Sequence, residues 1–199
     1  MTQLILASTS SARRLMLAQA GVDCDAIAPM VDEDPIKQSL LDHCVSARDI
    51  ADALAEAKAV KLSSKFPQAL VIGADQTLEC ADGSVLDKPE FPADAITQLT
   101  LMAGATHKLY SAVVVAERGE PVWRFVATSR MTVRPLSDAF IADYVETHWD
   151  AIRHCVGCYQ IEGAGAQLFS QIQGGHFDIM GLPLLPLLSF LRERGILPL

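Results

Sequence analysis

The chain has little of what membrane, secreted or polyanion-binding proteins need. No apolar run approaches the roughly 20 residues that span a bilayer, and the N-terminus lacks the basic and hydrophobic segments of a secretory signal. Cations are also few, because 16 Lys and Arg face 24 Asp and Glu, for a net charge of −8 at pH 7. A nucleic-acid coat or an anionic-membrane binder needs a basic face. We therefore expect a cytoplasmic protein with no nucleic-acid polymer and no membrane as partner.

Cysteine is too sparse and too scattered for a disulfide framework. The count is five, which is odd, and the chain shows no export signal. Cys155 and Cys158 form a CxxC with His154 beside it, but no second pair of ligands with zinc-site spacing follows. Incidental thiols are the better interpretation. A P-loop GxxxxGK[ST] and a GxSxG nucleophile elbow are also absent.

What is present indicates an α/β fold with a mixed central sheet. The 199 residues are half hydrophobic, enough for one domain or two closely joined lobes. Strand-like runs alternate with helical patterns, which predicts this class. The runs are residues 4–6, 70–72, 112–116 and 124–133, and the helical patterns are 46–61, 93–101, 138–147 and 184–194. Asp82-Gly83 predicts a hairpin turn between Leu78 and Leu86.

The first fifteen residues have the pattern of an anion-binding turn. Leu4–Leu6 reads as a short buried strand, followed by Ser8 and Ser10 and then by Arg13 at the start of an apolar-periodic segment. The first N–H groups of such a helix, its dipole and a nearby arginine favour an anion. The alternative is an ordinary serine N-cap with surface arginines.

Four further positions supply charges suited to phosphate chemistry. Glu33 lies in a Val-Asp-Glu stretch, Lys58 on an Ala-rich helix, Asp75 at the end of an apolar strand, and Lys88 before a proline. Cations offset phosphate charge, while carboxylates hold Mg²⁺ or take a proton from water. Alone, Lys58 fits a solvated helix face, Asp75 a turn or cap, and Lys88 a loop.

The order of these motifs resembles the Maf family of nucleoside triphosphate pyrophosphatases. The resemblance runs from Leu4 to about Leu185 through LILASTSSARR, VDE, AEAKA, GADQ, LDKP, ATHKLYSA and CVGCYQIEGAGAQLF…GLPL. It implies one Maf-like domain over residues 1–199, an elongated fold with two lobes around a deep cleft, like the inosine triphosphate pyrophosphatases. It also implies cleavage between the α and β phosphates, a divalent metal (Mg²⁺ or Mn²⁺) and a homodimer.

The resemblance assigns roles to the residues singled out above. Asp75 matches the family's proton acceptor, and Glu33 matches the acidic residue that, with Asp75, lies near the metal. The phosphate-binding residues are Ser8, Ser10, Arg13, Lys58 and Lys88. Ser11 stands where the family usually has proline. His107, in ATHKLYSA, fits a buried structural histidine better than a catalytic one.

Three positions govern base choice in the family. Gln76 and Glu162 match the members that act on 7-methyl-GTP, whereas Ala12 replaces their tryptophan. A carboxylate at Glu162 can accept from the N–H groups of guanine, which uracil and thymine do not offer. We expect a guanine-type or broad triphosphate substrate instead of dTTP or UTP. The alternatives are a nucleotide-binding regulator of cell division and septum formation, and a phosphatase or phosphotransferase that uses the same anion site.

Overall fold

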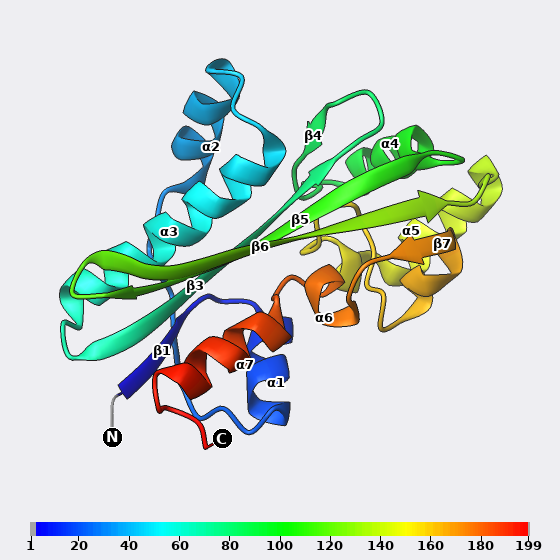
Figure 1. Cartoon of the computed structure of the whole chain (residues 1–199). Coiled ribbons are helices and arrows are strands. Elements are labelled where there is room, and N and C mark those ends of the chain that lie inside the picture. Colours follow the sequence, from blue (N-terminus) through cyan, green and yellow to red (C-terminus); the bar gives the residue numbers. More distant parts are fainter. Residues whose placement is uncertain (1–2, 199) are drawn as a thin grey trace. The chain divides into compact units, whose positions relative to one another are not determined.

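The structure, a computed structural model, describes residues 3–198 and consists of a mixed sheet with helices (Figure 1). In chain order the elements are β1 (Gln3–Ala7), α1 (Ser11–Gln19), β2 (Asp25–Ile27), α2 (Glu33–Asp42), α3 (Ala47–Lys65), β3 (Ala69–Glu79), β4 (Val85–Leu86), α4 (Pro92–Met102), β5 (Thr106–Glu117), β6 (Glu120–Val133), α5 (Asp138–Ile152), the 3₁₀ helix η1 (Ala164–Leu168), β7 (Phe169–Gln173), α6 (His176–Ile179) and α7 (Leu184–Glu193). The strand order is β2-β1-β3-β5-β6-β7, and β4 pairs with β3. Because β1 is parallel to β2 and β3 whereas β6 and β7 are antiparallel, the predicted mixed α/β sheet is confirmed.

The chain forms two compact units, each assembled from separate segments. Unit 1 comprises residues 1–76, 111–127 and 175–199, and unit 2 comprises residues 77–110 and 128–174. Three of the four crossings between the units fall inside β3, β5 and β6. A crossing inside a strand carries no loop or linker composition, so the linear sequence shows no boundary there.

Unit 1 places its helices on two faces of the strands, and the alternation of side chains along β1 explains how. Leu4 and Leu6 point into a core shared with α1 and α7, whereas Ile5 and Ala7 pack with Leu62 of α3. Figure 1 shows α3 on one side of the strands and α1 and α7 on the other. The chain reverses at the end of β1, and this turn is where the first predicted site residues lie.

Unit 2 is built around the packing of α4 against α5. Pro92 occupies the first turn of α4, and Ser137 caps α5 by accepting from the backbone N–H of Phe140 at 3.2 Å. The hairpin predicted at Asp82-Gly83 is confirmed, because Leu78 of β3 pairs with Leu86 of β4. No helix within residues 3–198 is long and apolar enough to cross a membrane.

The structure corrects the number and the lengths of the elements predicted from the sequence, above all of the strands. The predicted helices are present, but α2, α6, β2 and β7 were missed, and β3 and β5 are much longer than expected. Asp75 therefore lies inside β3 and not at its end. Pairing between β1 and β3 stops at Ala7 and Gly73, so Asp75 comes just beyond the end of β1 while its own strand continues to Glu79.

Candidate active site

The site in unit 1 depends on an unusually close approach of α3 to β3. A Cβ atom on Gly73 would lie 2.7 Å from the backbone nitrogen of Ala59 and closer still to the carbonyl oxygen of Ala55. Only glycine on the strand and alanines on the helix allow this contact. It brings the helix turn that carries Lys58 directly over the strand that carries Asp75.

Lys58, Asp75 and Glu33 meet in an ion-pair cluster. The Nζ atom of Lys58 lies 2.6 Å from Oδ1 of Asp75 and 2.8 Å from Oε2 of Glu33, the first residue of α2. Lys58 is only 6 % exposed and Asp75 8 %, so Lys58 does not lie on a solvated face. A buried ammonium needs such partners, because an isolated buried charge is strongly disfavoured. The structure thus joins three residues that are 17 or more positions apart in the chain.

The serine turn after β1 forms as the sequence predicts. Ser10 caps α1, and its hydroxyl accepts from the backbone N–H of Arg13 at 3.4 Å. The buried Ser8 hydroxyl accepts from the N–H of Ser10 at 3.2 Å. Both hydroxyls stabilise the start of the helix, and each retains its own O–H as a donor. The serine N-cap and an anion-binding turn are therefore compatible.

Arg13 is half-buried and oriented by the backbone. Its Nε donates to the carbonyl of Gly181 at 2.8 Å and its Nη1 to the carbonyl of Ala74 at 2.9 Å. Burial lowers the pKa of Arg13, while Asp75 and Glu33 act in the opposite direction. The guanidinium still stays charged at neutral pH, because arginine is not deprotonated in proteins. Two of its five N–H donors are used by these carbonyls, which leaves three for an anion.

Gln76 and Ala12, predicted to govern base choice, flank this site. Gln76 follows Asp75 on β3, and its side-chain nitrogen donates to the Ser111 hydroxyl and to the backbone carbonyls of Asp178 and Ile179. Ala12 lies in the first turn of α1 and is half-buried. Ser111 and residues 178–181 did not stand out in the sequence as site residues, although Ser111 belongs to the ATHKLYSA motif.

Lys88 and Glu162 belong to unit 2. Both are exposed, Lys88 just after β4 and Glu162 in the turn before η1. Burial raises the pKa of the Cys155 thiol; Glu162 adds to this rise and Lys88 opposes it. These two predicted site residues therefore lie in the same part of unit 2.

The segment before Glu162 is anchored by hydrogen bonds of aromatic side chains, and it contains the buried thiol of Cys158. Tyr159 and His107 form a hydrogen bond of 2.8 Å between the phenol oxygen and Nε2. Burial raises the pKa of Cys158 to about 12, so this thiol is protonated at neutral pH. The Tyr144 hydroxyl donates to the carbonyl of Cys158 at 3.3 Å. Buried, protonated thiols of this kind are inert, in keeping with incidental cysteines.

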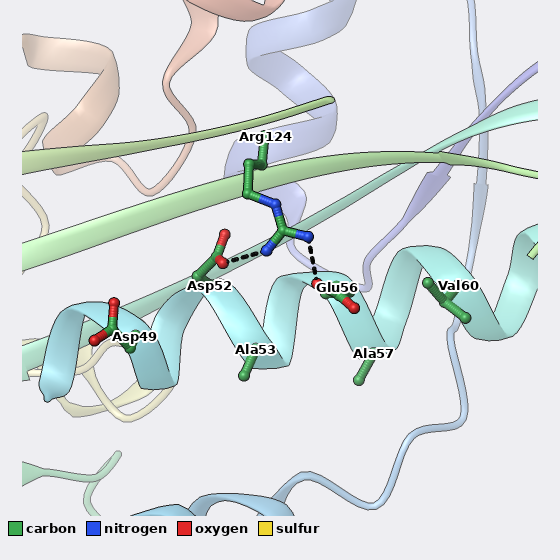
Figure 2. A pocket seen from close by; sticks show the side chains of 7 residues that line it. All are labelled: Asp49, Asp52, Ala53, Glu56, Ala57, Val60 and Arg124. Carbon is green, nitrogen blue, oxygen red and sulfur yellow. Dashed lines mark hydrogen bonds and ion pairs between the residues drawn. The ribbon is translucent and has the colours of Figure 1, made fainter. Parts of the chain in front are cut away.

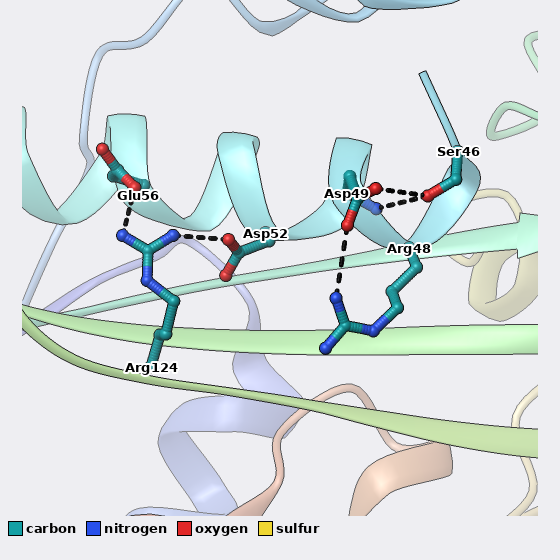
Figure 3. Close-up of polar contacts among 6 residues, drawn as sticks. All are labelled: Ser46, Arg48, Asp49, Asp52, Glu56 and Arg124. Atoms are coloured by element: carbon teal, nitrogen blue, oxygen red, sulfur yellow. Dashed lines mark hydrogen bonds and ion pairs between the residues drawn. The ribbon is translucent and has the colours of Figure 1, made fainter. Parts of the chain in front are cut away.

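A hollow of about 370 Å³ lies along another face of α3 and is separate from the Lys58 cluster. Figure 2 shows Arg124 of β6 reaching over α3, where it contacts Asp52 at 2.5 Å and Glu56 at 2.6 Å. Near the start of the helix, Ser46 donates to the Asp49 carboxylate, which also pairs with Arg48 (Figure 3). At 100° per residue, Asp52 and Glu56 project well away from the side of α3 that carries Lys58. This second group ties β6 to the helix that positions Lys58.

The carboxylates of Glu33 and Asp75 suit a divalent cation bound together with a phosphate. Each uses one oxygen toward Lys58, which leaves Oε1 of Glu33 and Oδ2 of Asp75 as hard ligands. Within residues 3–198, no three His, Cys, Asp or Glu side chains converge as a ready metal cage. Mg²⁺ is commonly held by one or two carboxylates together with water and substrate phosphates. The residues present fit that manner of binding.

Comparison with known proteins gives matches along nearly the whole chain. A sequence model described as Maf-like protein matches residues 3–194. A nucleoside triphosphate pyrophosphatase of Sphingopyxis alaskensis is 53% identical over 195 residues, which is 98% of each chain. Proteins of the same name from Caulobacter vibrioides and Rhodospirillum rubrum are each 51% identical, over 99% and 97% of this chain and 98% and 95% of their own length.

Proposed function

The chain belongs to the Maf-like protein family, and from this premise we propose that it is a nucleoside triphosphate pyrophosphatase. The observation that carries the proposal is the buried Lys58, which bridges Asp75 and Glu33 beside the arginine and serines that follow β1. This arrangement combines cations for a polyphosphate with a carboxylate that can act on water. Its relatives of about 50% identity carry that enzyme name over their full length.

In the proposed mechanism, the residues of unit 1 divide into ligands of the phosphates, ligands of the cation and a proton acceptor. Arg13 and Lys58 bind and orient the phosphates, and Ser8 and Ser10 donate their hydroxyl protons to phosphate oxygens. Asp75 accepts a proton from the attacking water at Oδ2, because its Oδ1 faces Lys58 at 2.6 Å; the second lone pair of Oδ2 stays available to a cation. Glu33 and Asp75 would hold a divalent cation, which when bound neutralises phosphate charge. The bond between the α and β phosphates breaks, giving a nucleoside monophosphate and pyrophosphate.

We further propose a guanine-type base, with 7-methyl-GTP and GTP as the first candidates. Glu162 is exposed, and a carboxylate there can accept from the N1–H and N2–H₂ groups of guanine. The resemblance also assigns Ala12 and Gln76 to base choice and Lys88 to the phosphate, and these assignments are predictions. The homodimer implied by the resemblance and the cytoplasmic location expected from the composition remain predictions.

The test is product identification with a panel of GTP, 7-methyl-GTP, ITP, dTTP and UTP in Mg²⁺. Monophosphate plus pyrophosphate is the expected product pair, and Asp75→Asn should lower kcat by at least about 10³-fold, within the range for loss of a general base. Release of orthophosphate would indicate the phosphatase instead. Nucleotide binding without turnover of any substrate would favour the regulator of cell division.

Glu162→Gln tests the base assignment separately. The preference for guanine over pyrimidine substrates, measured as a ratio of kcat/KM values, should fall by roughly 5- to 150-fold, which corresponds to about 1–3 kcal/mol for a bidentate base contact. Gln167→Glu serves as the matched control, because residue 167 is exposed in the same loop region, in η1. An unchanged ratio in Glu162→Gln would remove this residue from base recognition.

A further inference from the structure

Residues 178–181, which we call the brace segment, are bound through their backbone carbonyls by three side chains of unit 1. Gln76 Nε2 donates to the carbonyls of Asp178 at 3.2 Å and Ile179 at 3.0 Å. The Ser111 hydroxyl donates to the Asp178 carbonyl at 2.6 Å, and Arg13 Nε donates to the Gly181 carbonyl at 2.8 Å. Four hydrogen bonds from β3, β5 and α1 thus hold a segment of four residues.

These contacts form a closed circuit around Asp75. Arg13 also binds the carbonyl of Ala74, the residue before Asp75, at 2.9 Å, while Gln76 is the residue after it. The circuit therefore runs from Ala74 through Arg13 to Gly181, along the brace segment, and back through Gln76. It is tight at Gly181, whose φ is +96° and where an added Cβ would lie 3.3 Å from Nη2 of Arg13.

Both N–H groups of the Gln76 side-chain amide are used in hydrogen bonds. Nε2 carries two N–H groups, and three acceptors lie within 3.2 Å of it, including the Ser111 hydroxyl at 2.8 Å. Rotating the amide would place its oxygen against two carbonyl oxygens, so this orientation is determined by the network. The Ser111 hydroxyl is only 1 % exposed and is itself used as both donor and acceptor.

We propose that Gln76 and Ser111 are positioning residues that hold Arg13 in its phosphate-binding orientation by fixing the brace segment. The proposal rests on the role given above to Arg13 as a ligand of the triphosphate. The carbonyl of Gly181 is the acceptor that orients the guanidinium. The brace segment keeps this carbonyl in place only while Gln76 and Ser111 bind the carbonyls of Asp178 and Ile179. Loss of either side chain weakens phosphate binding whatever the base, so this role of Gln76 takes the place of the base-reading role that the resemblance implies.

Inorganic tripolyphosphate is the decisive probe, because it has phosphates and no base. We expect Gln76→Leu and Ser111→Ala to weaken its binding, measured by calorimetry, by about 5- to 10-fold each, as for one or two lost hydrogen bonds. The two effects should not add in the double variant, since both side chains hold the Asp178 carbonyl. Ser111→Thr retains the hydroxyl and should bind like wild type.

Steady-state kinetics supply the second readout. In both variants the KM values for GTP and dTTP should rise by the same factor, with kcat changed less than KM. Ser129→Ala is the matched control, because Ser129 is equally buried at 1 % exposure but lies in unit 2. This control should leave tripolyphosphate binding and KM unchanged.

Three outcomes would overturn the proposal. A changed GTP to dTTP ratio in Gln76→Leu, with normal tripolyphosphate binding, would make Gln76 a direct reader of the base. A lower unfolding midpoint with unchanged binding would leave both residues a structural role only. Absence of tripolyphosphate binding by the wild type would remove the premise about Arg13. If instead the variants weaken tripolyphosphate binding but the wild type hydrolyses no nucleotide, the positioning role stands and the proposed enzyme function fails.

Discussion

Unit 1 buries a charged pair, Lys58 with Asp75, and unit 2 buries a neutral pair, His107 with Tyr159. In unit 1, Lys58 lies between the carboxylates of Asp75 and Glu33. In unit 2, His107 bonds Tyr159, its Nδ1 is buried without a partner, and its ring lies 6.1 Å from that of Phe169. Burial lowers the pKa of His107 to about 4, so the ring is neutral at pH 7.

The difference in charge between the two pairs indicates which of them is suited to binding and chemistry. A buried charge persists only where opposite charges lie within contact distance, and such a site can exchange partners with an arriving ion. A neutral pair surrounded by aromatic rings has no charge to offer, and its hydrogen bond instead fixes the position of neighbouring backbone. The charged pair is thus suited to chemistry and the neutral pair to anchoring.

The largest expected effect comes from removing the cation of the charged pair. Lys58→Met leaves the buried carboxylate of Asp75 and the partly exposed one of Glu33 without the ammonium that bridges them, and should cost about 4 kcal/mol in the free energy of unfolding. Urea unfolding at pH 7 measures this loss. Lys65→Met, on the exposed last turn of α3, is the matched control and should change stability by less than about 0.5 kcal/mol.

The double variant Lys58→Met/Asp75→Asn separates charge from packing. A neutral amide at position 75 no longer needs the ammonium, so part of the lost stability should return. If Lys58→Met were as stable as Lys65→Met, the buried carboxylate of Asp75 would not need the ammonium as its partner, which would contradict the contrast drawn between the charged and the neutral pair.

A single methyl group at Gly73 should break the charged pair indirectly. The added Cβ of Gly73→Ala would lie 2.7 Å from the Ala59 nitrogen, so α3 must move away from β3. Overpacking of this kind costs about 3 kcal/mol at the upper end of its usual range. It should also lower kcat, because Lys58 moves away from Asp75. Gly163→Ala, whose nearest new neighbour would be 3.9 Å away, should leave stability nearly unchanged.

Local signals explain which parts of the fold were predictable from the sequence. Ser10, Ser46 and Ser137 cap helices within three residues of themselves, and Pro92 begins α4, so these helices were visible as local patterns. The strands were underestimated because the second half of β3 and the first half of β5 carry polar residues, such as Asp75 and His107, that no apolar run reveals.

The site was predictable only in part, for a physical reason. The charged residues were identified from motif order, and the structure brings Glu33, Lys58 and Asp75 into contact. The partners of Arg13 were not identified, because backbone carbonyls 61 and 168 residues away carry no side-chain signature. The close approach at Gly73 was likewise not identified, because it depends on the contact between β3 and α3, and the sequence of either element alone does not reveal that contact.

The neutral pair predicts a pH dependence of stability. In the folded protein His107 has a pKa of about 4, against 6.5 for the ordinary group, so the unfolded chain binds this proton first as pH falls. The contribution is complete above pH 6.5 and is lost as pH falls toward 4, by at most about 3 kcal/mol.

Urea unfolding of wild type and His107→Gln between pH 7 and 4 measures this contribution. Between pH 7 and 4 the free energy of unfolding should fall less steeply with decreasing pH in the variant than in the wild type. The two slopes should differ by at most the equivalent of one bound proton, because the other titrating groups are unchanged. Identical slopes in the two proteins would mean that His107 is not held neutral by burial.

Tyr159→Phe should have a smaller effect than the changes above, and it separates the effect of the hydrogen bond on His107 from the effect of burial. It removes the partner at 2.8 Å from Nε2 but keeps the ring, whose centroid lies 4.8 Å from that of Phe169. We expect a loss of about 1–2 kcal/mol for the unpaired ring nitrogen, or a Tm lower by a few degrees. Tyr144→Phe, which removes a longer bond of 3.3 Å to the Cys158 carbonyl, should cost less.

Because burial is what lowers the pKa of His107, the free energy of unfolding of Tyr159→Phe should depend on pH with the same slope as that of the wild type. A slope that disappeared with the phenol oxygen would instead make the hydrogen bond the cause of the neutral state.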